Sequence, residues 1–107
     1  MHITTLKALK LLDQKKEVFT GLFKHGSLMV EVYRPDGIDM QTPHDRDEIY
    51  VVIAGSGEFV NGDQRVLFGP GDFLFVPAGV EHRFINFTDD FSTWVFFYGP
   101  QGGEKTE

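Results

Sequence analysis

The sequence predicts an all-β domain, a sandwich or small barrel of the jelly-roll type, with a short N-terminal helix or strand before it. From residue 18 onward, about eight short segments rich in β-branched and aromatic residues follow one another. Gly, Pro, Asn and Asp residues that favour turns separate these segments at even spacing. No later segment has helical periodicity, and many short, evenly spaced strands are typical of sandwiches and barrels.

The N-terminal segment has a different pattern. Leu6, Leu9 and Leu12 recur at roughly helical spacing, which predicts a short helix over residues 5–14. An edge strand is the alternative.

The β segments are defined by their apolar runs and by the turns between them. Asn61-Gly62 predicts a hairpin with a two-residue type I′ turn, because that turn needs positive φ at both of its central positions. The expected strands are 18–23, 27–33, 48–54, 57–60, 65–68, 72–76, 82–87 and 92–98.

Length and composition fit one packed domain. The 107 residues predict a single domain over 1–107, with a core over about 18–99 and a flexible tail over 100–107. Hydrophobic residues make up 41% of the chain and aromatic residues 14%. The eleven phenylalanines could fill a small barrel or line an apolar pocket, and composition does not separate these uses.

Charge and cysteine content exclude several functions. The net charge is −6, and the basic residues Lys7, Lys10, Lys15 and Lys16 are interrupted by leucine and aspartate, which argues against binding to nucleic acid. The chain has no cysteine, so disulfides, thiolate zinc sites and cysteine nucleophiles are excluded. No apolar run is long enough for a signal segment or a membrane span. We therefore expect a cytoplasmic protein that does not bind membranes.

His44 and Glu48 are candidate metal ligands at the start of an apolar run. Two ligand atoms of one zinc-like ion must lie within about 4 Å of each other. A continuous strand would hold residues 44 and 48 about 13 Å apart. The pair can share an ion only if the chain turns at Asp45-Arg46-Asp47, so that His44 ends one strand and Glu48 begins the next.

A third ligand must come from elsewhere in the chain. His82 directly follows the segment "GDFLFVPAGVE", where a strand meets a Pro-Ala-Gly turn and returns. This places it, like Glu48, at the start of a strand. His2 is terminal and His25 falls in the expected hairpin loop "FKHGS", so both are expected at the surface.

Two motifs resemble those of the cupin superfamily, which consists of small jelly-roll β-barrels. The family's second motif is complete, at Gly71, Pro77, Gly79, His82 and Asn86. By average composition, five fixed identities at fixed spacing arise by chance on the order of 10⁻⁶ to 10⁻⁷ per start position. The resemblance covers roughly residues 27–99.

The first cupin motif is degenerate in this chain. Glu48 and Gly55 have the expected spacing, and His44 aligns with the second histidine of the motif. Thr42 stands where the first histidine would be. Asp36 stands in place of the leading glycine, with Gly37 one residue later.

The resemblance implies a divalent metal centre. Family members with the full motif hold the ion with four side chains, and this chain offers three, His44, Glu48 and His82. A neutral hydroxyl at Thr42 is a weak substitute for an imidazole, so the fourth position is open to water, to substrate or to Gln41. Two histidines and one carboxylate suit Fe(II) in oxygen chemistry, and Mn, Ni, Zn or Cu are also compatible.

Strand alternation predicts the walls of the site. If His82 faces inward, Phe84 and Asn86 do so too, and if Glu48 faces inward, Tyr50 and Val52 follow. Thr42 is expected to accompany His44 on a shared strand. These residues predict an apolar, aromatic pocket for a small molecule, although plain core packing is the alternative for each aromatic residue. Asn86 is also interpreted as a residue that satisfies backbone groups, and Gly55, Gly71, Pro77 and Gly79 as shaping turns.

The resemblance implies a small-molecule enzyme of dioxygenase, isomerase or cyclase type. A non-catalytic cupin that binds a small ligand, with or without metal, is the alternative, and a structural protein with a vestigial site is a third. No catalytic residue is assigned, since only Glu81 and Tyr50 are nearby titratable groups. A homodimer is expected from the resemblance, with "MVEVY" or the N-terminal segment covering an exposed sheet edge.

Overall fold

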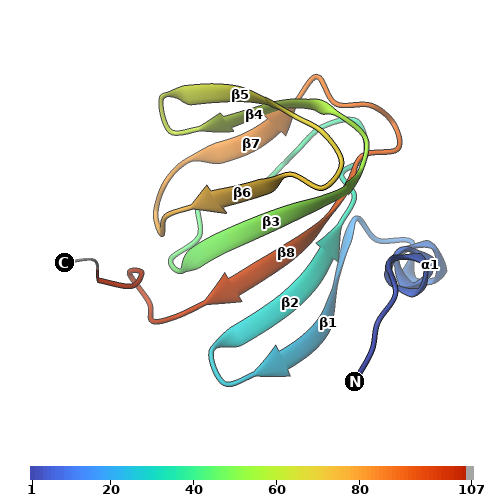
Figure 1. Ribbon diagram of the computed structural model, residues 1–107, viewed down its shortest axis with the longest axis horizontal. Helices are drawn as coiled ribbons and strands as arrows, with labels where there is room; N and C mark the ends of the chain where they lie inside the picture. Colours follow the sequence, from blue (N-terminus) through green and yellow to red (C-terminus); the bar gives the residue numbers. More distant parts are fainter. Residues whose placement is uncertain (106–107) are drawn as a thin grey trace.

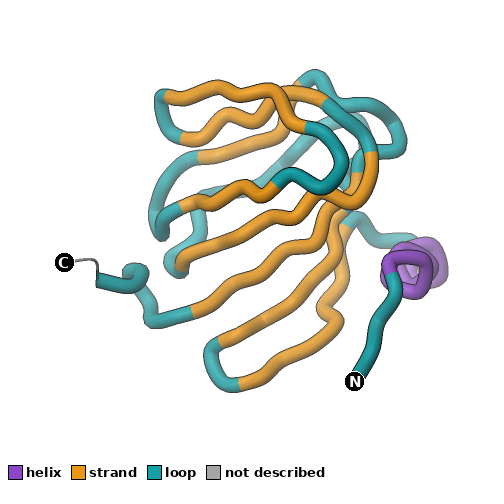
Figure 2. The backbone as a smooth tube through the Cα atoms, in the orientation of Figure 1, coloured by secondary structure: helices purple, strands orange, loops and turns teal. Residues whose placement is uncertain are grey.

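The computed structural model describes residues 1–105 and shows an N-terminal helix followed by strands in two sheets (Figures 1 and 2). The predicted all-β architecture is confirmed, and the strands lie close to their expected positions. The elements are α1 (Thr5–Lys15), β1 (Phe19–His25), β2 (Leu28–Tyr33), β3 (Asp47–Ala54), β4 (Gly57–Asn61), β5 (Gln64–Phe68), β6 (Phe73–Val76), β7 (His82–Ile85) and β8 (Ser92–Tyr98).

The two sheets form a jelly roll. One sheet has five strands in the order β1-β2-β8-β3-β6, and the other has three in the order β5-β4-β7. Every pairing is antiparallel. Because β8 lies between β2 and β3, the last strand joins the two halves of the larger sheet (Figure 1).

The N-terminal segment is a helix, so the alternative of an edge strand is wrong. The Thr4 hydroxyl accepts a hydrogen bond from the Lys7 N–H at 3.1 Å and caps the first turn. The helix ends at Lys16, which takes a left-handed conformation with φ 54°. Leu12 is buried in a small cluster with Val32, on the outside of the five-stranded sheet.

The β4–β5 hairpin forms, but its turn lies one residue later than predicted. Asn61 pairs with Gln64, so the turn residues are Gly62 and Asp63. Of these two, Gly62 alone has positive φ, at 61°, and the turn is therefore not type I′. The Asn61 side chain donates a hydrogen bond to the Phe75 carbonyl at 2.9 Å, which holds Asn61 within the strand.

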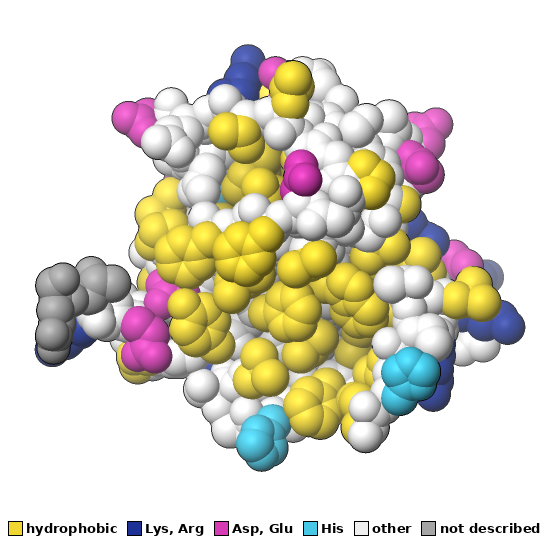
Figure 3. Space-filling model, in the orientation of Figure 1, with side chains coloured by type: hydrophobic (Ala, Val, Ile, Leu, Met, Phe, Trp, Pro, Cys, Tyr) yellow, Lys and Arg dark blue, Asp and Glu magenta, His cyan; other side chains and the backbone are white. Residues whose placement is uncertain are grey.

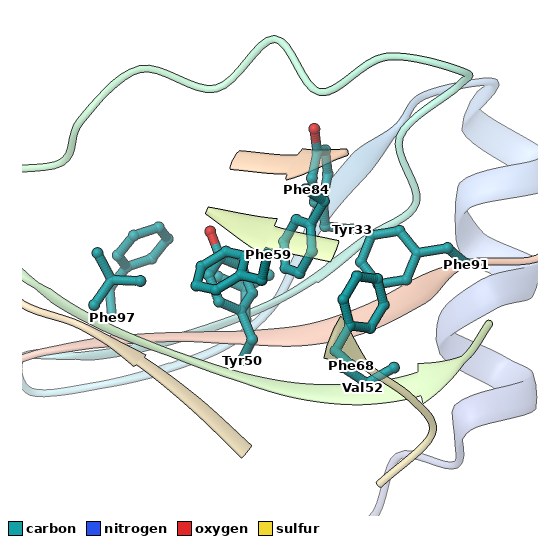
Figure 4. Packing of buried hydrophobic residues seen from close by; sticks show 10 residues of the cluster. Tyr33, Tyr50, Val52, Phe59, Phe68, Phe84, Phe91 and Phe97 are labelled. Atoms are coloured by element: carbon teal, nitrogen blue, oxygen red, sulfur yellow. The ribbon is translucent and has the colours of Figure 1, made fainter. Parts of the chain in front are cut away.

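Aromatic rings fill the space between the sheets (Figure 4). The Phe84 ring centre lies 4.6 Å from that of Phe59, 4.5 Å from that of Phe91 and 4.9 Å from that of Tyr50. These separations are typical of tilted and edge-to-face aromatic contacts. The cluster packs against the predicted ligand His82, whose ring centre lies 6.0 Å from that of Tyr50.

The outer face of the five-stranded sheet is also apolar. Strand register aligns one residue from each strand in a continuous row across this face. Figure 3 shows hydrophobic side chains gathered there. The row consists of Phe75, Ile49, Phe96, Val30 and Phe23.

The strand expected to offer a dimer edge does not lie at an edge. The "MVEVY" segment belongs to β2, which is paired on both sides, with β1 and with β8. The sequence pattern identified the strand but not its neighbours, because pairing with β8 depends on a distant segment.

The described part of the expected tail is attached to the body of the protein. The Gly102 N–H donates to the Asp45 carbonyl at 2.6 Å, and the Glu104 N–H donates to Asp47 Oδ2 at 2.8 Å. Residues 106–107 of that tail lie outside the described residues. Within residues 1–105, the structure contains no helix with the length and hydropathy needed to cross a bilayer.

Candidate metal centre

The three predicted ligands converge at one end of the barrel. Glu48 Oε1 lies 3.0 Å from His82 Nε2 and 4.0 Å from His44 Nε2. One potential ligand atom from each residue lies within 4.8 Å of the others. Donor atoms of a single ion lie within about 4 Å of one another, so small side-chain rotations would bring all three onto one cation. His2 and His25 are exposed and take no part.

The chain bends between His44 and Glu48, as the metal hypothesis requires. The bend lies at Asp45 and Arg46, and Glu48 is the second residue of β3. His44, however, does not end a strand, and its expected shared strand with Thr42 is wrong. Residues 34–46 form no strand, because their polar groups are held by individual hydrogen bonds rather than by a neighbouring strand.

The turn that precedes β7 is attached to the segment that contains His44. The Gly79 N–H donates to the His44 carbonyl at 2.6 Å, and the Ala78 N–H donates to Asp47 Oδ1 at 3.0 Å. Gly79 has φ 80°, a conformation that residues with a Cβ rarely adopt. This docked turn places His82 opposite Glu48, which explains why the two sequence motifs must occur together.

Two other motif glycines also have the predicted structural roles. Gly55 has φ 86°, and a Cβ there would meet the Phe91 Cα at 2.5 Å. Gly71 has φ 85° in the turn before β6.

His82 is oriented so that one ring nitrogen can bind a cation. Its side chain is fully buried, and its Nδ1 is 2.9 Å from the Val80 carbonyl, to which it donates a hydrogen bond. In the neutral ring, Nε2 therefore directs its lone pair at Glu48. Burial lowers the pKa of His82, but the contacts with Glu48, the Val80 carbonyl and the charge of Asp39 together raise it above its usual value.

The buried ends of Glu48 and His82 have no hydrogen-bond partner of good geometry. This is true of both Glu48 carboxylate oxygens and of His82 Nε2. Two electron-rich atoms that face each other at 3.0 Å in a buried site need a proton or a metal cation between them. An imidazole pair with a carboxylate is a donor set that divalent transition metals prefer. The residues present therefore fit a metal ion.

A buried carboxylate that the sequence analysis missed organises the loop before His44. Asp39 Oδ1 accepts from the Tyr33 hydroxyl at 2.7 Å and from the Gln41 N–H at 3.0 Å. Asp39 Oδ2 accepts from Gln41 Nε2 at 2.9 Å and from the Phe84 N–H at 2.8 Å. The Tyr50 hydroxyl completes the network by donating to Gln41 Oε1 at 2.8 Å. Asp39 lies in a polar stretch of sequence, and no local pattern distinguishes it from a solvated loop residue.

The two tyrosines of this network remain hydrogen-bond donors. Burial, followed by the hydrogen bond to Asp39, raises the pKa of Tyr33. Burial, followed by the negative charge of Glu48, raises the pKa of Tyr50. Both phenols are consequently protonated at neutral pH.

A cavity of about 260 Å³ opens beside the candidate ligands. Gln41 and Thr42, the predicted neighbours of the metal site, line it together with His44 and Glu48. Glu31 of β2 also lines it and was not predicted. A single carboxylate within the apolar run "LMVEVY" is a sequence signal that could have identified Glu31.

The other predicted pocket residues lie elsewhere. Tyr50, Val52 and Phe84 are buried in the aromatic core beneath the cavity and are not part of its wall. Asn86 does not face inward, because β7 ends at Ile85 and Asn86 takes a left-handed conformation with φ 51°. Its exposed amide donates to Glu58 at 2.6 Å.

Comparison with protein families and sequences places these motifs in a known context. A family model described as the cupin domain matches residues 29–98. An uncharacterised protein of Streptomyces coelicolor is 29% identical over 85 residues, covering 78% of this chain and 81% of that protein. Acireductone dioxygenase of Rhodopseudomonas palustris is 43% identical over 61 residues, which cover 48% of this chain and 37% of that enzyme. The match therefore spans well under half of the dioxygenase.

Solved structures share the fold. A cupin superfamily protein from Desulfitobacterium hafniense has a TM-score of 0.64 at 19% identity, covering 77% of this chain and 76% of that chain. KdgF from a Halomonas species has a TM-score of 0.64 at 19% identity, covering 77% and 78% of the two chains.

The raised pKa of His82 predicts how the stability of the metal-free protein depends on pH. A histidine has a pKa of about 6.5 in an unfolded chain, and its folded value is higher here. The stabilisation is fully present below about pH 6.5 and is lost as the pH rises through the folded value. With a chelator present, the stability advantage of the wild type over His82→Gln should fall as the pH rises above about 6.5 in urea denaturation.

The exposed His2→Gln variant is the matched control and should show the wild-type pH profile. An advantage over His82→Gln that grows with pH would contradict the protonated pairing of His82 with Glu48.

Proposed function

Because the chain belongs to the cupin family, we propose that it holds one divalent transition metal on His44, Glu48 and His82 and acts as a small-molecule enzyme. The observation that supports this proposal most strongly is the convergence of buried, unpartnered Glu48 and His82 atoms beside a cavity. Such atoms are costly unless a bound cation satisfies them.

The donor set favours oxygen chemistry within this class. Two histidines and one carboxylate leave coordination positions free, an arrangement that suits Fe(II), while Mn, Ni, Zn and Cu also accept these ligands. The 43% identity to part of an acireductone dioxygenase supports the dioxygenase type over the isomerase and cyclase types. The bound ion would supply Lewis acidity and a template for two oxygen atoms of the substrate.

The three candidate ligands differ in their exposure to solvent. Glu48 and His82 are almost completely buried, whereas the His44 side chain is 36% exposed. The Phe97 ring packs edge-on against His44 with ring centres 4.8 Å apart and fixes the imidazole plane. Thr42, in place of the first motif histidine, lies at the cavity wall. A ligand would therefore approach from the His44 and Thr42 side.

A non-catalytic ligand-binding protein is the second candidate, and one observation favours it. The two titratable residues considered as catalytic groups do not line the cavity, since Glu81 is exposed and the Tyr50 hydroxyl is bound to Gln41. Chemistry here would therefore depend on the metal and on the cavity's own residues. Ligand binding without product formation in the Fe(II)-loaded protein would favour the binding role.

Metal content tests the proposed centre. Protein purified without a His tag or chelator, or supplied with Fe(II), Mn(II), Ni(II), Cu(II) or Zn(II), should contain about one ion per chain, because residues 1–105 contain one such three-ligand group. His44→Ala/His82→Ala should lose it. His2→Ala/His25→Ala removes two exposed histidines and should keep it.

Elemental analysis after gel filtration measures the content, and circular dichroism verifies that each variant is folded. Equal metal content in the two double variants would contradict the proposed site.

We also propose that a second copy of the chain covers the apolar outer face of the five-stranded sheet. Phe73 and Phe75 are 64% and 40% exposed there. Five strands about 4.8 Å apart make a face of the order of 500 Å², and α1 covers part of it. A stable dimer buries about 800 Å² per partner, so the contact would use all of the face that α1 leaves open and residues around it. The row across it is uncharged, so two chains of net charge −6 can meet there without opposing like charges.

The dimer is tested by mass in solution. Sedimentation equilibrium should give twice the chain mass of 12.1 kDa for the wild type. Phe73→Lys/Phe75→Lys should give a monomer, because two ammonium groups from each chain would be buried at the contact. Leu67→Lys, at an 82% exposed position on the other sheet, should remain a dimer. A wild-type monomer at all concentrations would contradict the assembly.

A further inference from the structure

Glu31 presents a second carboxylate to the cavity beside the metal site. Glu31 lies on the inner face of the larger sheet, where it pairs with Val95 of β8, and Val95 pairs with Tyr50 of β3. Glu48 lies on the same face two strands away, about 10 Å to the side. Glu31 and Glu48 thus reach the cavity from two strands of the same wall, with β8 between them, and both line the space that a small molecule would occupy.

Glu31 is available to a ligand, whereas most other polar groups of the wall are not. The Tyr33 hydroxyl is bound to Asp39, and both ends of the Gln41 amide are bound within the same network. Within residues 1–105, the carboxylate of Glu31 makes no hydrogen bond or ion pair. Opposite it on β1 is Gly21, where no atom lies within 4 Å of the place a Cβ would occupy.

The cavity wall contains no Lys or Arg among the described residues. The negative charges of the Glu48 and Glu31 carboxylates would together balance the two positive charges of a divalent ion. An adjoining hollow that shares Glu31 and His44 includes Arg46, but the Arg46 guanidinium donates to the Ser27 carbonyl at 2.6 Å and Asp45 lies beside it. Arg46 and Lys24 keep their charges outside the cavity wall, so a phosphate or carboxylate group of a ligand inside the cavity would meet Glu31 with no cationic side chain in the wall beside it.

The surroundings of Glu31 make it a better hydrogen-bond acceptor than an exposed carboxylate. Burial first, and then the charge of Glu48, raise its pKa, while Lys24 lowers it in part. A carboxylate with a raised pKa is more basic, and it binds a hydroxyl donor more strongly in a partly buried site than in water.

We propose that Glu31 selects the ligand of this site by accepting a hydrogen bond from an uncharged hydroxyl group and by repelling anions. This inference depends on the proposed metal centre. It assigns the substrate to uncharged small molecules with two adjacent oxygen atoms, such as an enediol, a catechol or a hydroxyketone, on an apolar skeleton. Sugar phosphates and carboxylic acids are excluded from the class.

Pairs of catechols that differ in charge test whether Glu31 favours uncharged ligands over anions. The Zn(II)-loaded protein is used because zinc is redox-inert, so that only binding is measured. The uncharged probes are 3-methylcatechol and 4-methylcatechol, and their anionic counterparts are 2,3- and 3,4-dihydroxybenzoate. Calorimetry should show at least one methylcatechol binding roughly tenfold more tightly than its anionic counterpart. Glu31→Gln should reduce this ratio to about twofold, mainly by strengthening the anionic probe, whereas the exposed Glu17→Gln should not change it.

The possible failures are distinguishable. Ratios that are equal in the wild type and Glu31→Gln, at equal zinc content, would overturn the role of Glu31. Zinc uptake without binding of any probe would overturn the proposed substrate class. A wild type that takes up no zinc would contradict the metal centre itself.

Discussion

The candidate site depends on the docking of the turn before β7 onto the segment before β3. Two backbone N–H groups, from Ala78 and Gly79, bind Asp47 and the His44 carbonyl. The other Asp47 oxygen accepts from Glu104, so one buried carboxylate joins three segments that are distant in sequence. The pairing of Glu48 with Val76 brings the end of β6 next to β3, and the docked turn then places His82, on the other sheet, opposite Glu48.

The docked turn brings together groups that weaken the fold when neither a proton nor a metal ion lies between them. Buried Glu48 and His82 lack partners, and a buried charge without compensation lowers stability by several kcal/mol in general. The neighbouring aromatic core and the Asp39 network supply the rigidity that holds these groups in place. Buried polar groups that lower the stability of the fold are typical of functional sites.

Local pattern predicted the strands and the helix, and the resemblance to the cupin motifs predicted the three side chains that converge, His44, Glu48 and His82. Strand alternation and motif spacing are properties of short segments, and Glu48 and His82 are the second and the first residue of their strands. The sequence pattern did not predict features that depend on contacts between distant parts of the chain. Asp39 organises its loop by accepting hydrogen bonds from residues as distant as Phe84. The strand β2 lies inside the sheet because β8, from the end of the chain, pairs with it. Asn86 was misplaced because β7 ends before it, a boundary that alternation does not reveal.

X-ray absorption at the metal edge of the Fe(II)-loaded protein would test the central claim most directly. The account predicts two imidazole nitrogens with further oxygen ligands, and the loss of one imidazole in His82→Ala. A spectrum with oxygen ligands alone, unchanged in that variant, would show that the ion binds elsewhere and would contradict the site built from His44, Glu48 and His82.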